Sequence, residues 1–186
     1  MRNVILVPGF NGVPKIYEYF KQELEAKGYK VFIPDCPLRD EITWDGYRRA
    51  LDALNDKFDG SIIVAHSIGC AMSVKYVAEN SVKPFAYISL AGFAQPFETP
   101  NRPDLDKGVA ETTVHTNTGK RFAELVANRF SIYSDNDHIV PMELLEEFPM
   151  IINSKAVFIP GIGHMGKKIG LEKLPEVIDI IEKLDN

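Results

Sequence analysis

The segment IIVAHSIGCA, residues 62–71, places Ser67 directly after a run of apolar residues. Small residues, Ala65 and Gly69, stand two positions before and two positions after the serine. This spacing is typical of a nucleophile elbow, a tight strand-to-helix turn that exposes a serine hydroxyl above a sheet. A buried strand that ends in a plain turn fits the same residues. Because a serine hydroxyl is a weak nucleophile, catalysis also requires a base and a group that orients the base.

The best candidate for the base is His164, in the segment VFIPGIGHMGKK. It follows the last apolar run of the chain, and the three glycines of this segment allow a short loop to bend the imidazole back over a sheet. The other histidines are weaker candidates. His115 lies in a segment without a pattern, and His66, next to the serine, is expected to face away across the turn.

Two carboxylates that could orient the base, Asp135 and Asp137, lie in the segment SIYSDNDHIVP. A buried carboxylate that accepts the imidazole N–H would fix its tautomer and stabilise the imidazolium formed during reaction. The position of Asp137 favours it, because it directly precedes the HIVP stretch that opens a predicted helix. Asp135 also fits a turn residue and stays the alternative.

Backbone N–H groups that would bind a developing oxyanion are expected in two places. One is the N–H of Ile68, at the start of the helix after the serine, where the helix dipole favours an anion. The second is expected in the loop LVPGFNG, where Gly9 permits a sharp bend and the N–H of Phe10 points into the site, with Asn11 as the alternative. Turn formation alone also accounts for the glycines of this loop.

The elements that must position these residues follow one another as strand and helix. Apolar residues run without alternation in six short stretches, which is typical of strands covered on both faces of a parallel sheet. These stretches are residues 3–7, 30–33, 61–65, 85–90, 129–133 and 155–159. Predicted helices open at Pro14, Thr43, residue 68 and Leu174-Pro175. Gly28 is placed to end the first of them, and the apolar spacing of the second extends to Phe58. The pattern predicts a single α/β domain over residues 1–186.

Residues 92–118 interrupt this alternation, because they contain three prolines and little periodicity. A connection of this length in a compact domain predicts a lid or a substrate-binding loop, although a plain surface excursion also fits. Its Phe93 and Phe97, together with Phe10 and Asn11, are candidates for the lining of an acyl pocket. Aromatic residues at these positions also fit a plain core.

The composition is that of a soluble globular domain, with 186 residues, 45% hydrophobic and 25% charged. A net charge of −5 offers no basic surface for nucleic acid or an anionic membrane. The apolar start is too short for a signal peptide and no run is long enough to cross a bilayer, so we expect a cytoplasmic location. The histidines lack metal-ligand spacing and Cys36 and Cys70 lack a C-x-x-C pattern, so we expect no metal and no cofactor.

Taken together, the chain resembles the α/β-hydrolases, and more closely the small cap-less serine hydrolases of the retinoblastoma-binding-protein-9 type. The resemblance covers nearly the whole chain through VILVPGFNG, VAHSIGC, YSDNDHIVP and PGIGHMGKKIGLEKLPEV. It implies a three-layer sandwich with a six-stranded, mainly parallel sheet in the order 2-1-3-4-5-6. It also implies a triad of Ser67, Asp137 and His164, in the chain order of that superfamily.

The function that this resemblance implies is a serine hydrolase, foremost a carboxylesterase for small acyl esters. Two departures stand out: Ala65 occupies a position where glycine is usual, and Pro8-Gly9 replaces the His-Gly of many hydrolases. The same residues would serve a lipase, a thioesterase or a peptidase. A catalytically weak binding protein on this fold, with a protein partner, is the alternative from a different class, because fold does not determine function.

Overall fold

The computed structural model describes residues 1–98, 103–165 and 171–185. Within these residues the chain forms a six-stranded sheet in the order β2-β1-β3-β4-β5-β6, and every neighbouring pair of strands is parallel. The sheet and its strand order confirm the prediction from the sequence. The strands are β1 (Asn3–Val7), β2 (Lys30–Phe32), β3 (Ile62–His66), β4 (Ala86–Leu90), β5 (Asn128–Tyr133) and β6 (Lys155–Phe158).

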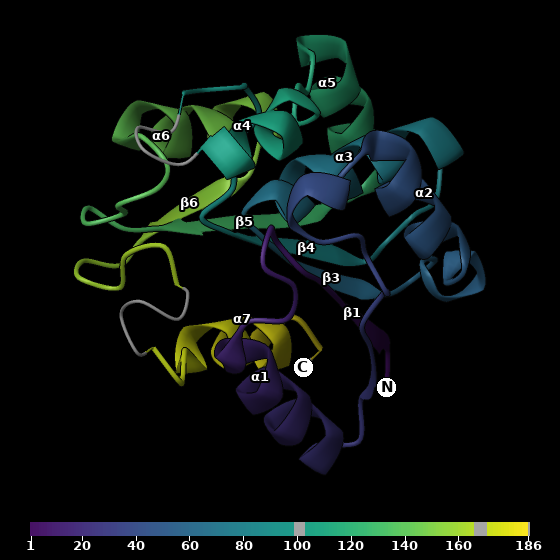
Figure 1. Cartoon of the computed structure of the whole chain (residues 1–186). Coiled ribbons are helices and arrows are strands. Elements are labelled where there is room, and N and C mark those ends of the chain that lie inside the picture. The colour runs from purple at the N-terminus through teal and green to yellow at the C-terminus, as the bar shows by residue number, and fades with distance from the viewer. Residues whose placement is uncertain (99–102, 166–170, 186) are drawn as a thin grey trace.

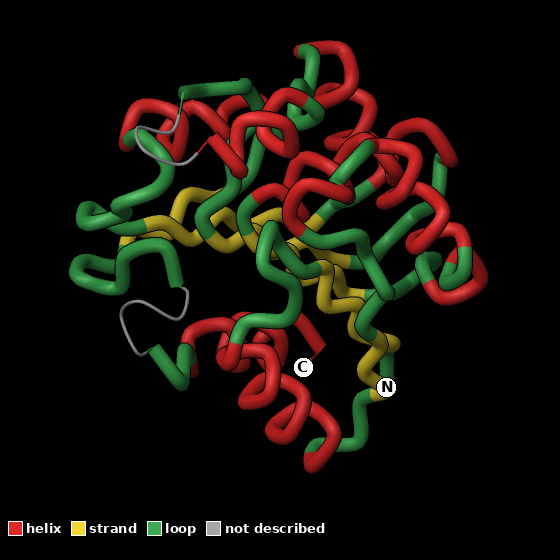
Figure 2. The backbone as a smooth tube through the Cα atoms, in the orientation of Figure 1, coloured by secondary structure: helices red, strands yellow, loops and turns green. Residues whose placement is uncertain are grey.

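Helices cover both faces of the sheet and complete a three-layer sandwich (Figures 1 and 2). One face carries α1 (Lys15–Ala26) and α7 (Pro175–Asp185). The other face carries α2 (Trp44–Asp52), α3 (Ile68–Asn80), α4 (Pro103–Ala110), α5 (Thr116–Leu125) and α6 (Met142–Ile151). Two short 3₁₀ turns, η1 (Arg39–Glu41) and η2 (Asn55–Lys57), flank α2. None of the helices in the described ranges is long and apolar enough to cross a membrane.

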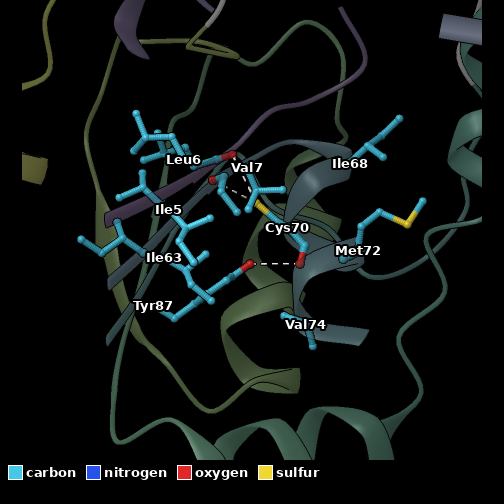
Figure 3. Packing of buried hydrophobic residues seen from close by; sticks show 14 of the residues in the cluster. Ile5, Leu6, Val7, Ile63, Ile68, Cys70, Met72, Val74 and Tyr87 are labelled. Carbon is cyan, nitrogen blue, oxygen red and sulfur yellow. Dashed lines mark hydrogen bonds between the residues drawn. The ribbon is translucent and has the colours of Figure 1, made fainter. Parts of the chain in front are cut away.

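The central strands lie between these layers, which explains their continuous apolar sequence. Every residue of β3 and β4 is buried, whereas the edge strand β6 is mostly exposed. Figure 3 shows Ile63 of β3 close to Tyr87 of the neighbouring strand β4, with which it is paired in the sheet. The buried Tyr87 hydroxyl donates to the carbonyl oxygen of Cys70, 3.0 Å away, so that this polar group is satisfied inside the core.

The predicted helix starts are present, and one predicted helix end is wrong. Gly28, just beyond α1, has a φ of +89°, which favours glycine, and the Thr43 hydroxyl caps α2 by accepting from the N–H of Gly46 at 3.1 Å. The apolar spacing after Thr43 predicted a helix through Phe58, but α2 ends at Asp52. The chain tightens there into η2, and this turn still places Phe58 in the core, fully buried.

Residues 92–118 are not a structureless loop, because they contain α4 and the first residues of α5. Residues 99–102 of this segment lie outside the described residues. The apolar side chains of Leu105 and Val109 in α4 are buried, and Gly108 brings the helix close to the turn at η1, since a Cβ there would lie 3.3 Å from a side-chain carbon of Ile42. One buried stripe on a short helix gave too weak a periodicity to be recognised from the sequence.

Two buried tyrosines hold the carboxyl end of β1 in place. The Tyr17 hydroxyl of α1 donates to the carbonyl oxygen of Val7 at 2.7 Å. The Tyr47 hydroxyl of α2 donates to the carbonyl oxygen of Pro8 at 3.0 Å. Because α1 and α2 lie on opposite faces of the sheet, the loop that follows β1 is fixed from both sides.

Candidate active site

Ser67 occupies a strained turn between β3 and α3. Its φ of 55° and ψ of −127° lie outside the ordinary regions for a residue with a side chain, and such strain is concentrated at functional sites. The turn is held by the Ser67 N–H, which donates to the carbonyl oxygen of Leu90 on the neighbouring strand at 2.9 Å. Ser67 is 5% exposed. The segment therefore forms the strand-to-helix elbow that the sequence predicted.

The crowding around this turn explains the small residues of the motif. A Cβ at Gly69 would lie 2.3 Å from the carbonyl oxygen of Pro8, a distance that no side chain can occupy. A Cβ at Gly9 would lie 3.1 Å from the Cβ of Ser67. The loop after β1 thus packs directly on the elbow. Ala65 lies fully buried two residues before the serine, so its methyl group is accommodated where many elbows have glycine.

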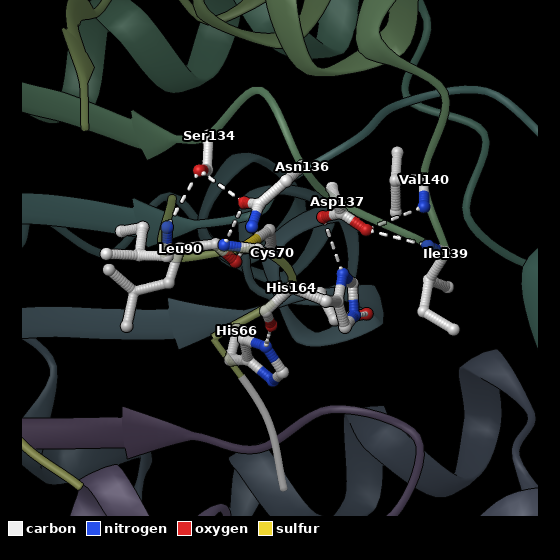
Figure 4. Close-up of polar contacts among 12 residues, drawn as sticks. His66, Cys70, Leu90, Ser134, Asn136, Asp137, Ile139, Val140 and His164 are labelled. Carbon is white, nitrogen blue, oxygen red and sulfur yellow. Dashed lines mark hydrogen bonds and ion pairs between the residues drawn. The ribbon is translucent and has the colours of Figure 1, made fainter. Parts of the chain in front are cut away.

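A chain of hydrogen bonds connects Ser67 to His164 and Asp137. The distance from the Ser67 Oγ to the His164 Nε2 is 3.0 Å. The distance from the His164 Nδ1 to the Asp137 Oδ2 is 2.8 Å (Figure 4). The three side chains come from loops at the carboxyl ends of β3, β6 and β5, where parallel sheets place their ligands. The structure therefore brings together the three residues that the sequence singled out.

The environment of Asp137 keeps its carboxylate charged. Burial of this side chain, which is 2% exposed, acts to raise its pKa. Hydrogen bonds from His164 and from the backbone N–H groups of Val140 and Ile139 outweigh burial and hold the pKa of Asp137 below its ordinary value. The two backbone bonds reach Oδ1 at 3.0 and 2.8 Å, so Oδ2 is directed at the imidazole (Figure 4).

Asp135, the alternative acid, binds the backbone of the loop that carries His164. Together with its neighbours Ser134 and Asn136, it forms a set of acceptors for three successive N–H groups. These bonds run from Gly161 N–H to Asp135 Oδ1 (2.9 Å), from Ile162 N–H to Ser134 Oγ (3.1 Å) and from Gly163 N–H to Asn136 Oδ1 (2.6 Å). The Gly161 N–H bond in particular lowers the pKa of Asp135. Sequence reasoning missed Ser134 and Asn136, because polar residues in a loop carry no periodic signal.

The glycines of the His164 loop adopt the conformations that their sequence suggested. Gly161 and Gly163 have φ values of 79° and 50°, in the left-handed region. The third glycine, Gly166, lies outside the described residues. The positive φ values allow the chain to turn back sharply after β6, which brings the imidazole over the sheet.

The prediction that His66 faces away from the site is wrong. Its Nε2 lies 2.8 Å from the carbonyl oxygen of His164, and the two imidazole rings are 5.0 Å apart (Figure 4). Because a carbonyl oxygen only accepts, the Nε2 of His66 must carry the proton. Burial, followed by the charge of His164, lowers the pKa of His66 to about 4. The strained φ of Ser67 explains the error, since it changes the side-chain alternation expected after a regular strand.

A cavity of about 370 Å³ lies beside Ser67. The four residues predicted to line an acyl pocket, Phe10, Asn11, Phe93 and Phe97, all line this cavity. The rings of Phe93 and Phe97 meet edge to face, with their centroids 5.0 Å apart. Ile68 and Phe10, whose N–H groups are the predicted oxyanion donors, also line it. The lining residues are Gly9, Phe10, Asn11, Gly12, Val13, Pro14, Arg39, His66, Ser67, Ile68, Phe93, Phe97, Leu105, Val109, His138, Ile139 and His164.

The described part of the chain contains no group of three or more His, Cys, Asp or Glu side chains arranged to hold a metal ion. The buried thiols of Cys36 and Cys70 are both free. Burial raises the pKa of each thiol to about 12, so neither is a reactive thiolate near neutral pH.

A parallel sheet in this order, with a serine elbow after β3, defines the chain as an α/β-hydrolase. More narrowly, the sequence model of the serine hydrolase family matches residues 4–183, and the chain belongs to this family. No curated protein matches its sequence.

Solved structures share the fold at low sequence identity. The ydeN gene product from B. subtilis has a TM-score of 0.83 at 20% identity, over 99% of this chain and 98% of that chain. A carboxylesterase structure from the ammonia-oxidizing thaumarchaeon Nitrososphaera gargenis has a TM-score of 0.73 at 18% identity, over 98% and 89% of the two chains. A thermophilic esterase from Thermogutta terrifontis, with malate bound, has a TM-score of 0.67 at 15% identity, over 100% and 91%.

Proposed function

We propose that the protein is a carboxylesterase that cleaves esters of small acyl groups. The observation that carries the proposal is the continuous hydrogen-bonded chain from Ser67 through His164 to the buried Asp137. Membership of the serine hydrolase family supports hydrolysis as the class of reaction. The fold shared with solved esterases supports the choice of esters.

In the first half of the reaction, the Ser67 Oγ attacks the ester carbonyl carbon. The Nε2 of His164 accepts the hydroxyl proton, and Asp137 stabilises the resulting imidazolium through Nδ1–H. The tetrahedral intermediate then collapses. Its C–O bond to the alcohol breaks, His164 returns the proton to the leaving alkoxide, and an acyl-serine ester remains on Ser67.

In the second half, water replaces the alcohol. His164 accepts a proton from the water as its oxygen attacks the acyl carbon, and a second tetrahedral intermediate expels the Ser67 oxygen, which regains the proton. In both intermediates, the N–H groups of Ile68 and Phe10 hold the oxyanion. Each donor of this kind is worth about 10²- to 10³-fold in rate. No cofactor takes part.

The size and lining of the cavity support a small acyl substrate. A volume of about 370 Å³ is at the lower end of the range for small-molecule sites, which is roughly 300–1,000 Å³. The rings of Phe93 and Phe97 offer an apolar surface to an acyl or alkyl chain. Long lipid chains would exceed this space, which favours a short-chain esterase over a lipase.

A panel of p-nitrophenyl esters from acetate to decanoate tests the proposal, with matched thioester and anilide substrates to separate the related activities. We expect kcat/KM to be highest for short acyl chains and higher for esters than for anilides. Ser67→Ala should abolish turnover. Ser81→Ala, which changes an exposed serine at the end of α3, serves as the control. Folded protein without ester turnover would instead support a binding role.

A further inference from the structure

One permanently charged side chain lines the active-site cavity. Among the described residues that surround this cavity, Arg39 is the single lysine or arginine, and none is an aspartate or glutamate. Arg39 is exposed, so it stands where the cavity meets solvent. Within the described part of the chain, its guanidinium forms no ion pair with a carboxylate. Among the described residues, no carboxylate thus occupies ion-pair distance of this cationic group at the cavity.

The backbone around Arg39 is fixed against the loop after β1, which contains Phe10. The N–H of Arg39 donates to the carbonyl oxygen of Phe10 at 3.0 Å. On its other side, the ammonium group of Lys107 in α4 donates to the carbonyl oxygen of Asp40 at 2.8 Å. Arg39 also has a φ of 53°, a left-handed conformation that costs free energy for a residue with a Cβ. Packing from both sides therefore holds an arginine in an unfavourable conformation against the loop after β1.

A guanidinium in this place matches a carboxylate in charge and in geometry, because its planar array of N–H groups binds both carboxylate oxygens at once. The cavity also offers the apolar side chains of Phe93, Phe97 and Leu105. We propose that Arg39 forms an anion subsite, and that the substrates are esters which carry a carboxylate in addition to an apolar chain. Half-esters of dicarboxylic acids are of this class. The proposal rests on the esterase function proposed above.

The test compares anionic and neutral esters of matched size. In the acyl arm, mono-p-nitrophenyl adipate is compared with p-nitrophenyl hexanoate. In the alcohol arm, 4-acetoxybenzoate is compared with 4-acetoxybenzamide. The quantity compared is the kcat/KM for the anionic ester divided by the kcat/KM for the neutral ester. We expect Arg39→Gln to lower this ratio about tenfold from its wild-type value in at least one arm. Arg39→Lys should retain part of the ratio. Arg49→Gln removes an exposed charge on α2 outside the cavity and should leave the ratio unchanged.

A binding measurement separates failure of the subsite from failure of the esterase function. Titration calorimetry measures the affinity of Ser67→Ala protein for intact monomethyl adipate and for methyl hexanoate, with and without Arg39→Gln. If Ser67→Ala protein prefers monomethyl adipate to methyl hexanoate, and Arg39→Gln removes this preference, the result supports the subsite even if the wild type cleaves no ester. Ester hydrolysis with ratios unaffected by Arg39→Gln in both arms overturns the subsite and leaves the esterase function standing.

A second inference rests on a different observation, the contact between His66 and the backbone of His164. The Nε2–H of His66 donates to the carbonyl oxygen of His164 at 2.8 Å, with His66 7% exposed. A Cβ at Gly9 would lie 3.0 Å from the Nδ1 of His66, so the loop after β1 packs against the other side of the ring. The imidazole of His66 therefore lies between the two loops that flank Ser67.

We propose that His66 is a positioning residue that fixes the height of the His164 imidazole above Ser67. The residue next to the nucleophile would thereby couple the elbow to the base-bearing loop. Its loss would leave the carbonyl oxygen of His164 without this donor and free the loop to shift. A displacement of about 1 Å between reacting groups costs on the order of 10²-fold in rate.

Substitutions that differ in the N–H donor test this role. We expect His66→Leu to lower kcat about 10- to 100-fold per folded protein, with KM changed less than about twofold, and His66→Gln to recover most of the loss. If His66→Leu does not fold, His66→Asn, whose side chain is too short to reach, replaces it. A His66→Leu protein with the wild-type kcat would contradict the role. So would a loss of kcat in His66→Gln as large as the loss in His66→Leu.

Discussion

The buried imidazole of His66 should make the protein less stable in mild acid. Its ordinary pKa is 6.5. Burial, with the charge of His164 adding to it, lowers the pKa in the folded state to about 4, against the opposing effects of the hydrogen bond to the carbonyl oxygen of His164 and of the Asp137 carboxylate. Between these two values the unfolded chain binds more protons than the folded chain. The free energy of unfolding must therefore decrease as the pH falls through this range.

The size of the effect follows from the difference between the two pKa values. Each pKa unit corresponds to about 1.36 kcal/mol. Integrating from neutral pH down to about pH 4, the titration of His66 removes about 3 kcal/mol of stability. A protein of ordinary stability, about 5–15 kcal/mol, would lose a substantial part of it. His66→Gln keeps an N–H donor and cannot be protonated, so it should lack this contribution.

Urea unfolding followed by circular dichroism at about pH 7.5 and pH 4 measures the effect in both proteins. Other groups also titrate in this range, but they are common to both, so the difference between the two pH-dependent losses reports His66. We expect the wild type to lose about 3 kcal/mol more than His66→Gln. Equal losses would refute the assignment of a buried, neutral imidazole at residue 66.

Two further predictions follow from the contacts of the elbow and of the base. Asp137→Asn should lower kcat by about 10⁴-fold. Asp135→Asn keeps an Oδ1 acceptor for the Gly161 N–H and the Ser134 hydroxyl and should cost less than about fivefold; the reverse order in an ester assay would contradict the assignment of the acid. Gly69→Ala should destabilise the fold by about 3 kcal/mol in urea unfolding, because its Cβ would meet the carbonyl oxygen of Pro8 at 2.3 Å. Gly161→Ala is the control, with a φ of 79° but open space around it, and should cost only about 1 kcal/mol.

The sequence predicted the sheet well because a parallel sheet leaves a strong local signal. Strands covered on both faces need continuous apolar residues, as in β3 and β4, and helix ends need particular residues, such as Thr43 and Gly28. The boundary of α2 and the presence of α4 were not predictable in this way. Both depend on tertiary packing, which turns Phe58 into the core and buries one stripe of a short helix.

The residues of the site were predictable where their chemistry is restrictive. A serine elbow, a histidine after the last strand and an acid after the fifth have few substitutes, so Ser67, His164 and Asp137 stood out. The supporting contacts were not predictable, because Asn136 binds a loop 27 residues away through an ordinary side-chain amide. The orientation of His66 depends on the strained turn, which no pattern in a single sequence specifies.

The most direct test of the central claim is covalent labelling of the purified protein with a fluorophosphonate probe. Such a probe reacts with a serine whose hydroxyl is activated by a neighbouring base. We predict rapid, stoichiometric labelling of the wild type, none in Ser67→Ala, slow labelling in His164→Ala, and wild-type labelling in Ser81→Ala. Failure to label folded wild-type protein, or labelling that survives in Ser67→Ala, would contradict the account.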